Sequence, residues 1–153
     1  MKFTLSKSLE ILERTPTILS TMLSGLSEDW VNCNEGENTW HAKEVVAHLI
    51  ICDKTNWIPR IKIMLSDNEE KSLLPIDMMA QFEMAKNNQL ESLLMEFKSI
   101  RGKSISDLRK FNLQKSDFAK TAFHPRIFEV NVQQLITTWV THDLSHLTQI
   151  SRT

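Results

Sequence analysis

The sequence predicts an all-α protein, a four-helix bundle with long connecting loops. Apolar residues recur at intervals of three and four over most of the chain, the spacing that places them on one face of a helix. No segment of useful length alternates apolar and polar residues as a half-buried strand does. The 153 residues include only 3 Gly and 4 Pro, which favours long helices and few tight turns. Four helices with two long connections is the simplest arrangement of these segments.

The first predicted helix covers residues 6–23, where leucines and methionines repeat at helical spacing. Pro16 interrupts it, because proline lacks a backbone donor and clashes with the preceding turn. We therefore expect a kink or a restart near Thr15. Residues 26–39 are rich in Asn and acidic residues, and this composition predicts a long loop.

The second predicted helix begins after Thr39, which is a good N-cap, and continues toward Leu65. Pro59 should bend its second half. The polar and charged residues 66–75 predict the next connection.

The third predicted helix begins near Asp77, whose charge suits a helix start, and it continues past Gly102 to Phe111 if packing outweighs the glycine's penalty of about 1 kcal/mol. An irregular stretch then leads to the last helix, predicted over residues 130–149 with Asn131 as its cap.

Composition excludes several classes of function. Lysines and arginines number 18 against 19 acidic residues, and without a basic block the chain has no footprint for nucleic acid. No apolar run is long enough to span a bilayer, and the N-terminus lacks the apolar core of a signal peptide, so we expect a cytoplasmic protein that does not enter a membrane. The cysteines, Cys33 and Cys52, form no Cys-x-x-Cys pair. The length favours one domain over residues 1–153.

Three histidines indicate a metal site. His142 and His146 are four residues apart on the last helix, so they lie on one face, and His48 lies among apolar residues of the second helix. Buried imidazoles need hydrogen-bond partners, and one metal ion would satisfy all three. The alternative is a bundle whose core histidines are satisfied by protein groups.

Two segments resemble the signatures of the DinB-like (DinB/YfiT) superfamily. They are Thr39-Trp40-His41-Ala42-Lys43-Glu44-Val45-Val46-Ala47-His48-Leu49 and His142-Asp143-Leu144-Ser145-His146-Leu147-Thr148-Gln149-Ile150. His124-Pro125 also lies where many members have a His-Pro pair. The resemblance implies a four-helix bundle in which His48, His142 and His146 bind a metal ion. The chain departs from the family at His41, where many members have serine, and at Phe128, where many have glycine.

Three neutral imidazoles leave a tetrahedral ion with one open position, as in catalytic centres. Zinc or nickel is the expected ion, and water or a thiol at that position would lose its proton near neutral pH. The resembled superfamily includes transferases that use low-molecular-weight thiols. We therefore expect a thiol transferase or a hydrolase acting on a small-molecule substrate, with a thiol as co-substrate in the first case. A non-catalytic metal-binding stress or interaction protein is the alternative, and a homodimer is compatible with either.

Other side chains have open roles. Cys52 is a candidate fourth ligand or a small buried apolar residue. His124 is the candidate catalytic residue, as a proton shuttle or substrate contact, and His41 also lies near the expected site. Asp143 should point about 100° away from His142, toward solvent. Ser145 and Gln149, which are close in helical register, are candidates for orienting a histidine ring.

Overall fold

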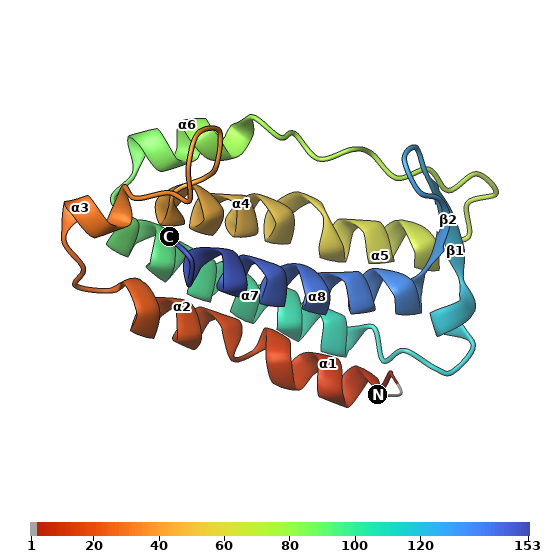
Figure 1. Ribbon diagram of the computed structural model, residues 1–153. Coiled ribbons are helices and arrows are strands. Elements are labelled where there is room, and N and C mark those ends of the chain that lie inside the picture. Colours follow the sequence, from red (N-terminus) through yellow and green to blue (C-terminus); the bar gives the residue numbers. More distant parts are fainter. Residues whose placement is uncertain (1–2) are drawn as a thin grey trace.

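The computed structural model describes residues 3–153 and confirms the four-helix bundle. Figure 1 shows four roughly parallel rods. They are formed by α1 (Leu5–Leu12) with α2 (Thr15–Leu23), by α4 (Ala42–Thr55) with α5 (Trp57–Leu65), by α7 (Leu90–Lys110) and by α8 (Val132–Ile150). None of the helices described is long and apolar enough to cross a membrane.

The second and third rods run in the same direction, so a long connection returns the chain along the outside of the bundle (Figure 1). It consists of residues 66–79 and α6 (Ala80–Asn87), which packs on α4. The predicted single helix from Asp77 was wrong, because Asn88 is extended and separates α6 from α7. The Asp77 carboxylate instead accepts the N–H of Met79 in a turn at 2.8 Å. Gly102 lies inside α7, as expected if packing outweighs its low helix propensity.

Both predicted interruptions exist, but one lies elsewhere. The first helix restarts at Thr15, as predicted. The second breaks at Asn56 and not at Pro59, which lies in the first turn of α5, where the missing proline N–H is tolerated. The N-cap of α4 is His41 rather than Thr39, and its backbone N–H donates to the Glu44 carboxylate at 3.0 Å. Asn131 caps α8 as predicted.

The loops hold short elements that the sequence pattern did not reveal. They are α3 (Glu28–Val31), the 3-10 helix η1 (Asp117–Ala119) and an antiparallel hairpin of β1 (Thr121–His124) and β2 (Phe128–Asn131). The prediction of an irregular stretch was therefore wrong for the hairpin, because four-residue strands are too short to show a clear alternation. Phe128 has a φ of 61°, in the left-handed region that glycine adopts more easily.

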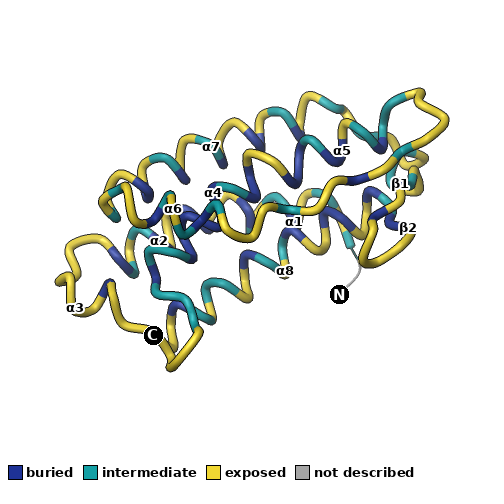
Figure 2. Tube along the Cα trace, turned by 90° about the horizontal axis from the view of Figure 1, so that it is seen from above, coloured by how far each residue is buried: buried dark blue, intermediate teal, exposed yellow. Residues whose placement is uncertain are grey.

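The buried face of each rod contributes to two apolar clusters (Figure 2). One lies toward the hairpin and includes Trp57, Leu108 and Trp139, and the other lies toward α3 and includes Leu49 and Phe97. Between them the rods bury polar residues, namely Thr15, His48, Asp53, Arg101, Ser104 and Asp143. The candidate site lies in this polar layer.

Candidate metal centre

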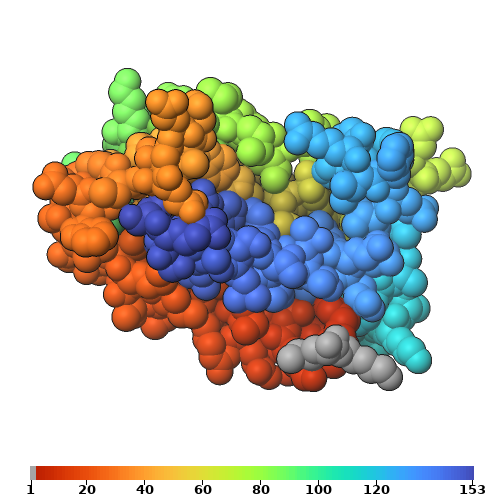
Figure 3. Space-filling model, in the orientation of Figure 1, coloured from red at the N-terminus to blue at the C-terminus, as the bar shows by residue number. Residues whose placement is uncertain are grey.

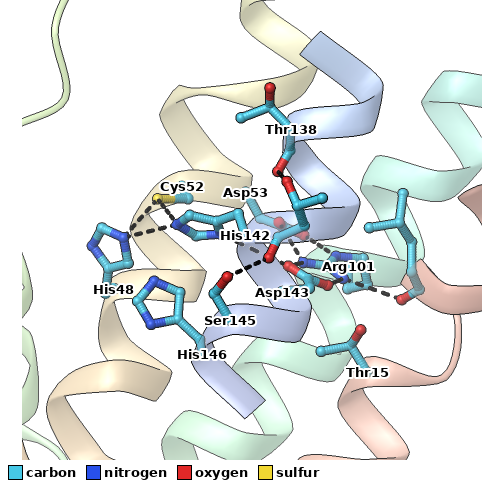
Figure 4. Close-up of polar contacts among 12 residues, drawn as sticks. Thr15, His48, Cys52, Asp53, Arg101, Thr138, His142, Asp143, Ser145 and His146 are labelled. Atoms are coloured by element: carbon cyan, nitrogen blue, oxygen red, sulfur yellow. Dashed lines mark hydrogen bonds and ion pairs between the residues drawn. The ribbon is translucent and has the colours of Figure 1, made fainter. Parts of the chain in front are cut away.

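The three predicted histidines converge between α4 and α8. His48 comes from α4, and His142 and His146 come from successive turns of α8 (Figure 4). One donor atom from each ring lies within 4.8 Å of the other two. The Nε2 atoms of His48 and His142 are 3.1 Å apart, close to the separation of about 3.3 Å for two nitrogens about 2.0–2.1 Å from one tetrahedral ion. The arrangement therefore fits a single metal ion.

Two glutamine side chains orient the rings. The Nδ1–H of His48 donates to Oε1 of Gln81 at 3.0 Å, and that of His146 donates to Oε1 of Gln149 at 2.8 Å. With Nδ1 protonated, each neutral ring presents the lone pair of Nε2 to the centre. The predicted role of Gln149 is confirmed, whereas Ser145 donates to the carbonyl of Thr141 instead. The sequence analysis did not predict a role for Gln81, because nothing in its local sequence distinguishes it. Only the packing of α6 on α4 brings Gln81 to His48.

Burial keeps two of these imidazoles uncharged. Desolvation lowers the pKa of both His48 and His146 to about 4, and the charge of the neighbouring His142 contributes to each shift. Three facing nitrogen lone pairs repel one another unless a proton or a cation lies between them. Because the low pKa values disfavour protons on two of the rings, this donor set favours a cation.

Aromatic side chains enclose the histidines. Trp40 stacks on His146 with ring centroids 6.0 Å apart and also lies 5.0 Å from His48. Trp57 meets His142 edge to face at 5.2 Å. These tryptophans form walls beside the centre, and the walls reduce access of water to it.

Cys52 lies beside the centre, one turn after His48. Its Sγ is 3.4 Å from Nε2 of His48 and 3.9 Å from Nε2 of His142. Burial raises the pKa of the thiol to about 12, and the charges of Asp53 and Asp143 add to this shift. The donor atoms that share the 4.8 Å neighbourhood belong to the three histidines and not to a cysteine. In the metal-free protein the thiol therefore lines the site as a neutral group.

A buried ionic cluster adjoins the histidines. Arg101 of α7 uses all five N–H donors, bonding two carboxylates, Asp53 of α4 and Asp143 of α8, and the carbonyl of Leu12 (Figure 4). The three charged side chains are at most 1% exposed. The cluster joins four rods of the bundle at the level of the candidate metal centre.

The prediction that Asp143 faces solvent was wrong. Its side chain is fully buried, because the centre of the buried face of α8 runs through Trp139 and Asp143, with the histidines at its edge toward α4. Burial opposes its charge, but the ion pair with Arg101 outweighs this and lowers the pKa of Asp143. Its Oδ1 lies 3.9 Å from Nδ1 of His142. Two carboxylates share one guanidinium, so the cluster has a formal charge of −1 beside the centre, which favours a cation there.

The sequence pattern contained one signal for this cluster. Asp53, Arg101 and Asp143 each occupy a position at helical spacing among core residues, where a charged side chain requires a partner. Two other candidates lie apart from the triad's donor atoms. His124 lies at the end of β1, and His41 precedes α4, where its Nδ1 contacts Glu44 at 3.1 Å.

Comparison with known protein families identifies the family of this chain. The model of the DinB superfamily matches residues 11–150. The chain belongs to the DinB superfamily. No match was found among curated protein sequences.

Solved structures share the DinB fold of this chain. YfiT from Bacillus subtilis, described as a probable metal-dependent hydrolase with an unusual four-helix bundle topology, superposes with a TM-score of 0.80 at 20% identity. The match covers 98% of this chain and 87% of YfiT. TT2238, described as a four-helix bundle protein, gives a TM-score of 0.60 at 17% identity and covers 98% and 100% of the two chains.

Proposed function

We propose that this protein is a metal-dependent enzyme that binds one divalent ion through His48, His142 and His146 and acts on a small molecule. The observation that carries the proposal is the convergence of three imidazole nitrogens, two of them held neutral and oriented by glutamine amides. A divalent ion held by three neutral ligands supplies the charge that deprotonates water or a thiol near neutral pH.

The residues of this chain would prepare the site for that chemistry. Gln81 and Gln149 fix the tautomer and orientation of two ligands, a role in which carbonyl and carboxylate oxygens commonly support metal-binding histidines. Trp40 and Trp57 form aromatic walls beside two of the ligands and reduce the access of water to them. The buried carboxylate of Asp143, whose Oδ1 lies 3.9 Å from Nδ1 of His142, would offset part of the positive charge of the bound ion.

Hydrolysis is supported by the likeness to YfiT, which is described as a probable metal-dependent hydrolase. Transfer of a low-molecular-weight thiol would use the same open coordination position. A single substrate screen should therefore include substrates for both reactions. Zinc or nickel is the proposed ion, since imidazole ligands suit both. A small-molecule substrate, a cytoplasmic location and a homodimer remain predictions.

We further propose that His124 contacts the substrate. Its Nδ1 accepts the backbone N–H of Arg126 at 3.1 Å, so Nε2 carries the proton and acts as a donor. Of the two roles predicted for His124, we therefore propose substrate contact and not proton transfer.

The first experiment is metal analysis by mass spectrometry on untagged protein purified without chelator. We expect about one ion per chain, lost in His146→Ala and retained in His41→Ala, a matched control outside the triad. Little metal in the parent protein after incubation with zinc and nickel would refute the site and leave a bundle with core histidines. Bound metal without turnover on panels of hydrolase and thiol-transfer substrates would favour the non-catalytic alternative.

A further inference from the structure

A small cavity lies between the β1–β2 hairpin and residues 75–78 of the long connection that leads into α6. Its volume is ≈ 180 Å³, and it is lined by Arg60, Pro75, Ile76, Met78, His124 and Arg126. In Figure 3 the surface is hollowed between the hairpin, in light blue, and the segment that leads into α6, in light green. The lining combines two cationic side chains and a histidine with an apolar wall.

The two arginines of the cavity have no acidic partner among residues 3–153. Arg60 is only 8% exposed, and its Nη2 donates to the carbonyl of Leu74 at 2.6 Å. Its Nε is buried and has no hydrogen-bond partner among the described residues. A buried guanidinium without a carboxylate is costly, and an anionic ligand would satisfy it. Arg126 adds a second positive charge at the solvent side.

His124 supplies a third donor. It is 9% exposed, and its Nδ1 is occupied by the N–H of Arg126, which leaves Nε2–H to donate. Desolvation and the charges of Arg60 and Arg126 lower the pKa of His124, so the ring is neutral at neutral pH. The cavity is therefore lined by three side chains with N–H donors, and its lining includes no acidic residue.

A buried stripe connects this cavity to the triad. His48, Cys52, Asn56 and Arg60 follow one another at intervals of four residues along α4 and α5, and all four are buried. In an unbroken helix Arg60 would lie about 12 Å along the axis from Cys52, and the break at Asn56 alters this spacing. Oδ1 of Asn56, between them, is a second buried polar atom without a partner among the described residues. The stripe places the cavity and the triad along the same buried face of α4 and α5.

We propose that Arg60, His124 and Arg126 bind a carboxylate group of the substrate, while the reactive part of the same molecule lies at the histidine triad. Guanidinium groups match the planar carboxylate, and Pro75, Ile76 and Met78 contact the carbon chain that joins the two ends. Since it assigns the carboxylate to a substrate, this inference rests on the proposed function.

The carboxylate site is tested first without metal. Glutarate is titrated into metal-free protein while the backbone amide of Arg126 and the ring nitrogens of His124 are followed by NMR. We expect saturable shifts, and the affinity for glutarate should fall at least tenfold in Arg60→Gln and in Arg126→Gln. Arg126 is exposed, so its substitution should not disturb folding. Arg14→Gln, an exposed arginine on the α1–α2 side, is the matched control and should bind as the parent does. Equal binding in all variants, no binding by the parent, or tighter binding of inorganic phosphate would overturn the proposal.

The link to the triad is tested with cobalt-loaded protein. Dicarboxylates from succinate to suberate are compared by their effect on the visible spectrum of cobalt and on the Arg126 amide. We expect the longer acids to change both signals together and to bind at least tenfold more tightly than acetate, a gain that Arg60→Gln abolishes. No dependence on length would overturn the shared binding region. Failure of cobalt to bind would refute the metal site alone, because the metal-free titration reports on the carboxylate site independently.

Discussion

Acid should destabilise the metal-free protein through His48 and His146. Each has a folded-state pKa of about 4, against the ordinary value of 6.5 that we take for the unfolded chain. Between these values the unfolded chain binds more protons than the folded one, so the free energy of unfolding must fall as the pH is lowered. At pH 5 the two pKa values give a loss of about 2 kcal/mol for each histidine.

Partial solvent exposure reduces this figure, and we expect about 2–3 kcal/mol for the pair between pH 7 and pH 5, a large part of a typical stability of about 5–15 kcal/mol. The buried carboxylates do not cause a loss of unfolding free energy between pH 7 and pH 5. Asp143, whose pKa is lowered, contributes stability that is lost only as the pH falls below its ordinary value of 3.8.

The assay is urea unfolding of chelator-treated protein at both pH values, followed by far-ultraviolet circular dichroism. A His48→Gln/His146→Gln variant should lose about 2–3 kcal/mol less than the parent between pH 7 and pH 5. His41→Gln is the control and should show the parent's pH dependence. If the double variant and the parent lose the same free energy, the reasoning from buried neutral imidazoles is refuted.

Three further predictions concern stability and metal affinity. Arg101→Met should lower the free energy of unfolding by about 3–5 kcal/mol, because it leaves two buried carboxylates without their partner; urea unfolding checks this, and a loss like that of the exposed control Arg109→Met would contradict it. Gln149→Leu should weaken zinc binding about 10–100-fold in competition with a chelating dye, and unchanged affinity would show that the amide does not support the ligand. Phe128→Gly should raise the free energy of unfolding by up to about 1 kcal/mol, since the exposed Phe128 has a positive φ, and a lower melting temperature would argue against strain there.

The comparison of predicted and observed elements separates local from long-range causes. The restart at Thr15 and the Asn131 cap were predictable, because proline geometry and N-capping act within one turn. The break at Asn56 was not, since the proline three residues later is tolerated in the first turn of the new helix. The hairpin was missed because its pairing joins residues across a turn, and the strands are too short for their own pattern to show it.

Local and long-range causes can also be separated within the candidate site. His142 and His146 were predicted to share a face by their spacing alone. His48 was added from its apolar setting, and the resemblance to the DinB superfamily then implied all three as ligands. Gln81 and Arg60 were not predictable, because each becomes part of a site through elements that meet only in the folded chain.

The sequence by itself therefore determined the helical class, the restart at Thr15, the Asn131 cap and the three candidate ligands, all of which follow from periodicity, short-range sterics and local motifs. Only the tertiary structure decided that Asp143 turns into the core to meet Arg101 and Asp53, and that Arg60 faces His124 across a cavity. Burial and charge compensation depend on what the other three rods place opposite a residue, and the one-dimensional pattern of a single helix does not contain that information.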